Sequence, residues 1–332
     1  MGLWRVVSRS CCKPIRLFCS FSNIRNMNAC DEQSGLRACL QARHRRVIHT
    51  IGNLFDVDCN LTHNDLKDQV EEHLLGAKAA GVSGMVVPGS TLEESRACLD
   101  IAERFGTSQF HMKTTVGVHP YHAEEWQNDT LSALRKMMVD NALVVAAVGE
   151  CGLDYSEGFP DRVFQLPVFE AQVQMACELN LPLFVHQRGA FADFVEVMNR
   201  YRTRCASVPV LVHCFTGDQK ELDWILSQDN YFLSFSGIIC KHERGQSLRQ
   251  VLEASRKRIA LTRVMVETDA PYLGFPGCRA ACETKKKKQY PNVPSALPHV
   301  VKALAACLHV DPALLAAETS STARKFFNVS QA

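Results

Sequence analysis

Eight short apolar runs, each followed by an amphipathic stretch, constrain the fold of this chain more than any other feature of its sequence. The runs lie at 54–60, 84–88, 113–119, 143–150, 182–186, 209–213, 231–236 and 263–269. Their apolar residues are largely continuous instead of alternating with polar ones, which is typical of parallel strands that are covered on both faces. The stretches between them have helical periodicity, so the chain is expected to alternate strand and helix.

Eight strand–helix units predict an α/β fold whose strands close into a TIM-type (β/α)8 barrel. The expected helices cover 66–81, 91–105, 123–141, 163–180, 190–201, 218–229 and 244–257, and two additional C-terminal helices cover 295–308 and 311–327. Barrels of about 250 residues routinely form one domain, so residues 50–330 are expected to form a single barrel domain. The alternative is an open, doubly wound sheet. That fold favours a glycine-rich phosphate loop after the first strand, and residues 60–64 (NLTHN) contain no glycine.

Residues 1–45 differ in composition from the rest of the chain and are expected to be an N-terminal extension. The basic residues at its start are Arg5, Arg9, Lys13, Arg16 and Arg25. No acidic residue precedes Asp31. An arginine-rich, serine-containing, acid-poor leader is typical of mitochondrial transit peptides; the alternatives are a disordered extension or a start at Met27. Mitochondrial location is therefore one expectation, and cytoplasmic or nuclear location is the other.

The overall composition limits the classes of partner and of compartment. The formal net charge is only +2, so contact with nucleic acid requires a local basic patch. The chain has 15 cysteines, but neither the pair at 11–12 nor Cys278 and Cys282 has the matching second pair of a structural zinc site. Reduced, mostly buried thiols are therefore expected instead of disulfides. No run of 18 apolar residues occurs, so no membrane span is expected.

Five of the eight expected strands end in an imidazole or a carboxylate. These residues are His119, Glu150, His186, His213 and Asp269. One such residue is more often a hydrogen-bonded rim residue than a metal ligand. In a TIM barrel, however, the carboxyl ends of different strands meet at one pole, where active sites form. Imidazole nitrogen and carboxylate oxygen are ligands of divalent metals, so the joint pattern predicts a metal site at that pole.

The sequence around these positions closely resembles the motifs of the TatD family of metal-dependent deoxyribonucleases, which is related to the amidohydrolases. The matching motifs are TTVGVHPY (114–121), VGECGLDY (148–155), VHCFTG (212–217) and VETDAPYL (266–273), and FDVDCNL (55–61) and FVHQR (184–188) stand where the family has two further motifs. The resemblance covers residues 53–328. It implies a hydrolase that cleaves phosphodiester bonds of DNA, as a 3′-5′ exonuclease.

The resemblance also implies a role for each matching residue. Glu150 would be the central metal-binding carboxylate, which bridges when two ions bind, and His186 and His213 would be imidazole ligands. Asp269 would be a ligand that also orients and deprotonates the attacking water. His119 would position the phosphate or assist the leaving group. The implied cofactor is one or two divalent ions, with Mg2+ or Mn2+ expected and Zn2+ as the alternative. Such an ion offsets phosphate charge and lowers the pKa of a bound water, and a nearby carboxylate accepts the proton.

The chain departs from the family pattern at several positions. Asp58 and Asn60 stand where many members have two histidines. A carboxylate and an amide suit Mg2+ or Mn2+ better than Zn2+, so both remain candidate metal residues; alternatively, Asp58 caps a turn and Asn60 is structural. The other departures, which are expected to weaken substrate placement, are Gln187, Gly189, Pro291 and Val293.

DNA, bound with little sequence specificity by a monomer, is the expected partner. Four consecutive lysines, Lys285, Lys286, Lys287 and Lys288, follow the eighth strand. Beside the active site they would bind phosphates in a salt-dependent way, although a run of this kind is also common in a solvated loop. The other candidates are Arg188 and Lys241 for phosphate, and Tyr121, Tyr155, Tyr272 and Phe215 for stacking on a base or lining the pocket.

Two other functions remain open at this point. The first is an amidohydrolase that acts on a C–N or ester bond, but such barrels commonly have a carboxylated lysine on the fourth strand, where this chain has Glu150. The second is a catalytically weak protein that binds nucleic acid, and it is motivated by the departures at Asp58, Gly189 and Val293. Cleavage assays with several metals, beside a binding assay, separate these cases from a nuclease.

Overall fold

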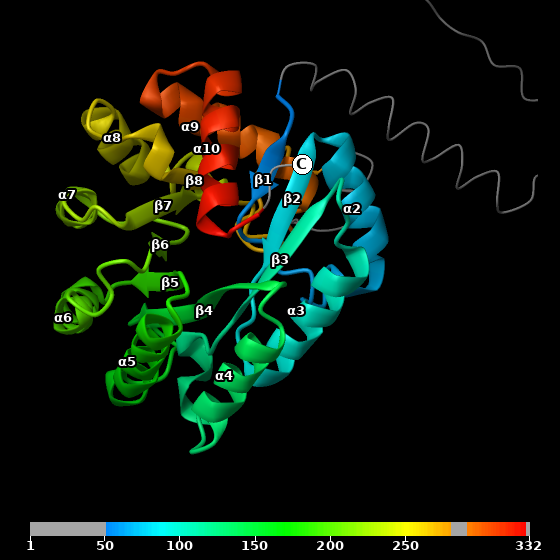
Figure 1. The fold of residues 1–332 in the computed structure, drawn as a ribbon. Helices are drawn as coiled ribbons and strands as arrows, with labels where there is room; N and C mark the ends of the chain where they lie inside the picture. Colours follow the sequence, from blue (N-terminus) through cyan, green and yellow to red (C-terminus); the bar gives the residue numbers. More distant parts are fainter. Residues whose placement is uncertain (1–50, 280–290, 330–332) are drawn as a thin grey trace, which may run out of the picture. The chain divides into compact units, whose positions relative to one another are not determined.

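The computed structural model describes residues 51–279 and 291–329. The predicted N-terminal extension, its targeting role, and Lys285 to Lys288 lie outside the described residues. The strands are β1 (Leu54–Asp56), β2 (Val82–Val87), β3 (His111–Val116), β4 (Val145–Asp154), β5 (Leu183–Arg188), β6 (Val210–Val212), β7 (Tyr231–Phe235) and β8 (Val264–Val266). They form one sheet in the order β1 to β8, and every neighbouring pair is parallel (Figure 1).

Hydrogen bonds just beyond the ends of β1 and β8 bring the two edges of the sheet together. The amide of Val57 donates to the carbonyl of Val266 at 3.1 Å, and the amide of Asp269 donates to the carbonyl of Asp58 at 2.9 Å. The nearby Asp56 is fully buried, and its carboxylate accepts hydrogen bonds from the amide and hydroxyl of Thr268, at 2.8 and 2.6 Å. These contacts confirm the predicted TIM-type barrel and exclude the open sheet.

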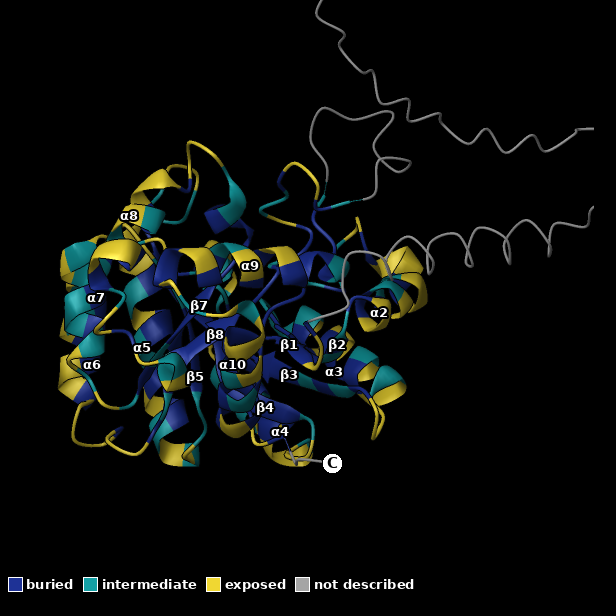
Figure 2. Cartoon of the chain, turned by 90° about the horizontal axis from the view of Figure 1, so that it is seen from above, coloured by how far each residue is buried: buried dark blue, intermediate teal, exposed yellow. Residues whose placement is uncertain are grey.

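The helices lie outside the strands, as Figure 1 shows. Those between strands are α2 (Val70–Ala79), α3 (Leu92–Phe105), α4 (Thr130–Asp140), α5 (Arg162–Leu179), α6 (Phe191–Tyr201), α7 (Gln219–Leu226) and α8 (Gln246–Ser255). Local sequence explains where some of them begin. The side chains of Thr91 and Asp218 accept hydrogen bonds from amides of the first turns of α3 and α7, which stabilises those ends. In Figure 2 the strands are buried, whereas the helices carry buried and exposed residues on different faces.

The inside of the barrel is a packed apolar core. Its members include Phe55, Val86, Ala147, Phe184, Leu211 and Met265 from the strands and Phe327 from the C-terminal segment. The ring of Phe327 lies 6.5 Å from that of Phe55 and 6.4 Å from that of Phe184. In β5, β6 and β8 the apolar residue is followed two positions later, on the same side, by His186, His213 and Glu267. The polar site is therefore confined to the carboxyl pole.

Two C-terminal helices, α9 (Leu297–Leu308) and α10 (Pro312–Phe326), follow the last strand as the sequence predicts. Helix α10 packs against β8 and β1, where the eighth helix of a TIM barrel belongs. Among residues 51–279 and 291–329, no single helix is long and apolar enough to cross a membrane. The segments Pro294–Leu308 and Pro312–Phe326 pass that test of length and composition only as a pair, and they are bent by 109°.

One prediction about the cysteines is wrong. Cys177 of α5 and Cys205, which follows α6, form a disulfide, with their Cα atoms 5.1 Å apart. The other seven cysteines in the described part of the chain are free thiols. Packing of α5 against α6 brings the pair together across 28 residues of sequence, and neither their spacing nor their neighbours marks them as partners.

Candidate metal centre

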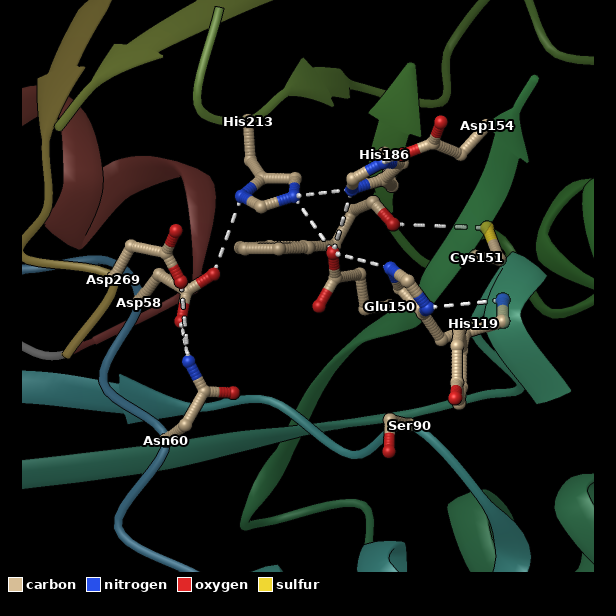
Figure 3. Close-up of polar contacts among 12 residues, drawn as sticks. Asp58, Asn60, Ser90, His119, Glu150, Cys151, Asp154, His186, His213 and Asp269 are labelled. Carbon is tan, nitrogen blue, oxygen red and sulfur yellow. Dashed lines mark hydrogen bonds and ion pairs between the residues drawn. The ribbon is translucent and has the colours of Figure 1, made fainter. Parts of the chain in front are cut away.

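Three imidazoles converge on the carboxylate of Glu150, which lies within the long strand β4. Oε1 of Glu150 lies 3.4 Å from Nε2 of His119, 3.2 Å from Nδ1 of His186 and 2.7 Å from Nε2 of His213 (Figure 3). The histidines follow β3, lie in β5 and follow β6, so neighbouring strands carry all four residues. The structure therefore brings these four predicted residues together at the carboxyl pole.

A second group of possible ligands lies on the other side of His213. Nδ1 of His213 is 3.2 Å from Oδ2 of Asp58 and 3.6 Å from Oε1 of Glu267, and all three residues are buried. Within residues 51–279 and 291–329, none of these three atoms has a hydrogen-bond partner. Buried polar atoms without partners are unfavourable, and a cation would supply the missing interaction. The donors of both groups therefore fit a divalent metal.

Asp269 lies beside this second group, as Figure 3 shows. The side-chain amide of Asn60 lies 3.3 Å from Oδ1 of Asp269 and 3.2 Å from Oδ1 of Asp58, so one amide is shared between two carboxylates. Burial raises the pKa of Asp269 well above its usual range, and the negative charge of Asp58 adds to this effect. Two buried carboxylates that share one hydrogen-bond donor repel each other, and a cation bound nearby would offset their negative charge.

The pKa values of Glu150 and Asp58 are shifted in opposite directions. Burial alone would raise the pKa of Glu150, but His213 and His119 outweigh burial and hold this pKa well below its usual range. Burial raises the pKa of Asp58 to about 7, because the nearby His213 compensates only in part. Glu150 is therefore ionised at neutral pH, whereas Asp58 is partly protonated there when no cation is present.

His186 is oriented by a carboxylate that the sequence analysis missed. Nε2 of His186 lies 2.8 Å from Oδ2 of Asp154, which is only 1% exposed. Burial would raise the pKa of Asp154, but hydrogen bonds from His186 and Ser156 lower it, so this carboxylate is ionised. It therefore accepts the proton of Nε2. Nδ1, which donates to Glu150 at 3.2 Å, is then the nitrogen that would lose its proton to bind a cation, as in the carboxylate–histidine–metal arrangement of many metalloproteins.

His119 has the opposite orientation. Its Nδ1 accepts a hydrogen bond from the amide of Tyr121 at 3.1 Å, so in the neutral ring the proton is on Nε2, which faces Glu150. Burial lowers the pKa of His119 below its ordinary value despite the nearby Glu150. His119 is therefore a neutral hydrogen-bond donor that faces the centre.

Glu267 is the second residue that the sequence analysis missed. It follows β8, and its Oε2 accepts a hydrogen bond from the hydroxyl of Ser234 at 2.6 Å. Glu267 precedes the last residue of its apolar run, and Asp154 follows the last residue of its own. In extended chain, residues two or four apart face the same side, so Glu267 before Asp269, and Asp154 after Glu150, could have been found from that spacing.

The candidates for contact with the substrate differ in their exposure to solvent. Arg188 ends β5 and is exposed. Phe215 is only 2% exposed and packs on Phe235, so the prediction that it lines the pocket or stacks on a base is wrong. The hydroxyl of Tyr155 donates a hydrogen bond to Oδ2 of Asp193 at 2.6 Å. The other two predicted stacking residues, Tyr121 and Tyr272, are 55% and 52% exposed.

The departures after the fifth and eighth strands have different surroundings. Asn292, which lies between Pro291 and Val293, is buried and donates to the carbonyl of Thr268 at 2.7 Å, so it fixes the segment that carries Asp269. Val293 is buried as an apolar residue. Nε2 of Gln187 is buried and has no hydrogen-bond partner among the residues that the structure describes.

A TIM-type barrel with histidines and carboxylates gathered at the carboxyl ends of its strands defines a metal-dependent hydrolase. The family described as TatD related DNase matches residues 55–328, and the chain belongs to this family. The resemblance seen in the sequence motifs is thereby confirmed.

Curated relatives agree with this assignment, and a solved structure has a similar fold. A protein of Erwinia tasmaniensis named 3'-5' ssDNA/RNA exonuclease TatD is 34% identical over 276 residues, which are 83% of this chain and 100% of the relative. A protein of the same name from Salmonella typhimurium is 33% identical over 83% of this chain and 99% of its own. A TatD homolog from Escherichia coli has a similar fold, with a TM-score of 0.71 at 22% identity over 83% of this chain and 98% of its own.

Proposed function

We propose that this protein is a divalent-metal-dependent exonuclease that hydrolyses phosphodiester bonds at the 3′ ends of single-stranded DNA. The observation that carries this proposal is the convergence of three imidazoles on Glu150, beside a buried group of carboxylates. Family membership and the names of the relatives supply the bond and the polarity. The glutamate in the fourth-strand position disfavours the amidohydrolase alternative.

The two groups of donors suit two ions of different preference. Glu150, His186 and His213 would hold one ion, and Asp58 and Glu267 on the other side of His213 would hold the other, with Asp269 and Asn60 beside them. Oxygen donors favour Mg2+ or Mn2+ at the second position, and imidazoles also accept Zn2+ at the first. A bound divalent ion would offset the negative charge of the phosphate and lower the pKa of the attacking water.

The chain's own residues then have three tasks. The carboxylate of Asp269, held by the amide of Asn60, accepts the proton of the attacking water. The proton on Nε2 of His119 is donated in a hydrogen bond to a phosphate oxygen, which holds the phosphorus in line. A bond from the water oxygen to phosphorus forms and the bond from phosphorus to the 3′ oxygen breaks. The products are a 5′-mononucleotide and a shortened strand, whose 3′ oxygen takes a proton from solvent.

Contacts with the rest of the strand are expected to be electrostatic. Arg188, at the carboxyl end of β5, and Lys285 to Lys288, in the segment after β8, are the proposed phosphate contacts. Such contacts give binding that weakens as salt is added and that depends little on sequence. A monomer is sufficient for this function, because the site is built from one chain.

Cleavage of end-labelled oligonucleotides tests the proposal. Single-stranded DNA, double-stranded DNA and single-stranded RNA are each incubated with Mg2+, Mn2+ or Zn2+, beside Glu150→Gln and Asp269→Asn proteins. The expected result is stepwise release of mononucleotides from the 3′ end of single-stranded DNA, which chelator and both substitutions abolish. Binding without cleavage in all three metals would instead favour the nucleic-acid-binding alternative.

A further inference from the structure

An aromatic pair, Tyr121 and Phe159, lies on one side of the metal centre and has no role in holding metal. The ring centre of Phe159 lies 6.0 Å from that of His119 and 6.4 Å from that of His186, and the Phe159 and His186 rings are nearly parallel, at 19°. Tyr121 packs edge-on against Phe159, with ring centres 5.4 Å apart and an angle of 83°. Phe159 therefore lies next to two histidines of the site, and Tyr121 lies next to Phe159.

The loop that carries Phe159 is anchored at both ends. The side-chain amide of the buried Gln165 donates to the carbonyls of Asp154 and Pro160, both at 2.6 Å, and its oxygen accepts from the amide of Asp154 at 2.8 Å. The carboxylate of Asp154, which orients His186, also accepts from the amide of Ser156 at 2.8 Å. The position of Phe159 relative to His186 is thus fixed before substrate binds, which reduces the entropy lost on binding.

Tyr121 is fixed in the same way but remains open to solvent. Its amide donates to Nδ1 of His119, and it lies in the short helix η2 (Pro120–Glu125), whereas its side chain is 55% exposed. Its ring is also perpendicular to that of His122, with ring centres 5.2 Å apart, and the exposed part of the side chain remains open to a ligand. Because the amide of Tyr121 is hydrogen-bonded to His119 of the site, a nucleotide next to the scissile phosphate can reach this ring.

We propose that Tyr121 is a stacking platform for the base of one of the two nucleotides that flank the scissile phosphate, and that Phe159 positions Tyr121. This inference rests on the proposed nuclease function and adds a subsite to it. Aromatic stacking accepts every base, because each has a π face, so the subsite agrees with little sequence specificity. It requires an unpaired, unstacked base, which gives a physical reason for preferring single-stranded ends.

The test uses the fluorescence of 2-aminopurine, which stacking on an aromatic ring quenches. Asp269→Asn protein, which retains Glu150, His186 and His213, is mixed with Mn2+ and single-stranded DNA that carries 2-aminopurine at the 3′ terminal, the penultimate or an interior position. Quenching is expected at the terminal or penultimate position only. It should be lost in Tyr121→Ala, retained in Tyr121→Phe, reduced in Phe159→Ala and unchanged in Tyr272→Ala.

A second measurement separates stacking from a general loss of structure. Tyr121→Ala should weaken binding of the DNA by between about 5-fold and 150-fold, which corresponds to the usual contribution of one stacked base. An oligonucleotide whose last two residues are abasic should bind Asp269→Asn protein equally with and without the additional Tyr121→Ala substitution. Equal quenching with and without Tyr121, or an equal loss for abasic DNA, would overturn the subsite. Failure of every protein to bind any oligonucleotide would instead overturn the nuclease function.

Discussion

The substitution Asp154→Asn should weaken metal binding although Asp154 is not itself a ligand. Asp154 accepts hydrogen bonds from two neighbours, from Nε2 of His186 through Oδ2 and from the amide of Ser156 through Oδ1, both at 2.8 Å. Asparagine has almost the same shape but only one acceptor oxygen. If that oxygen faces Ser156, its NH2 group faces Nε2 of His186, which must then become an acceptor.

The change of tautomer determines the size of the effect. With Nε2 as an acceptor, the neutral His186 carries its proton on Nδ1, the atom that lies 3.2 Å from Glu150 and is needed as the ligand. The alternative orientation of the amide leaves the Ser156 amide facing a donor. Loss of such an orienting carboxylate typically lowers metal affinity by 10- to 100-fold, or about 1.4 to 2.7 kcal/mol.

Calorimetric titration of the metal-free protein with Mn2+ measures this loss. Asp193→Asn is the matched control, because the carboxylate of Asp193 binds Arg162 and Tyr155 instead of an imidazole. We expect the control to bind Mn2+ as the wild-type protein does, and Asp154→Asn to bind it at least about tenfold more weakly. Equal Mn2+ affinity in Asp154→Asn and wild-type proteins would refute the proposed tautomer.

Three further predictions follow from the same structure. Asp56→Ala should lower the free energy of unfolding by about 2 to 6 kcal/mol, because the amide and hydroxyl of Thr268 then lose their acceptor where β1 meets β8. Urea titration measures this loss, and an unchanged midpoint would show that closure of the barrel does not depend on Asp56. Burial raises the pKa of Asp58 to about 7, above its unfolded value of about 4, so the metal-free protein should lose stability as the pH rises between these values. Metal should therefore raise the Tm more at about pH 8 than at about pH 6, and an equal rise at both would contradict this. Replacing Lys285 to Lys288 by glutamine should weaken DNA binding and make it less dependent on salt, and an unchanged salt dependence would exclude these lysines from the interface.

The barrel could be predicted because its cause is local in the sequence. Continuous apolar runs require burial on both faces, and eight of them separated by amphipathic stretches leave few arrangements. Residues at the ends of the runs, such as Glu150 and His213, were predicted because the pole of a TIM barrel is common to all strands. Their distances from one another could not be predicted, since register and strand length differ along the sheet.

Other features depend on contacts that no local pattern reveals. Phe215 follows a strand as Tyr121 does, but the backbone turns at Cys214, where φ is +46°, and the ring of Phe215 enters the core. Phe159 belongs to a loop with no periodicity, and its place beside His186 is set by the hydrogen bonds that Gln165 of α5 makes to both ends of this loop. Positions of this kind follow from tertiary packing and need coordinates.

The central claim is that Glu150, His186 and His213 share a divalent ion. A crystal structure of the protein soaked in Mn2+, with anomalous diffraction measured at the manganese edge, tests it most directly. The account predicts an anomalous peak in contact with Oε1 of Glu150, Nδ1 of His186 and Nε2 of His213. Manganese bound only elsewhere, in protein that cleaves DNA, would contradict it.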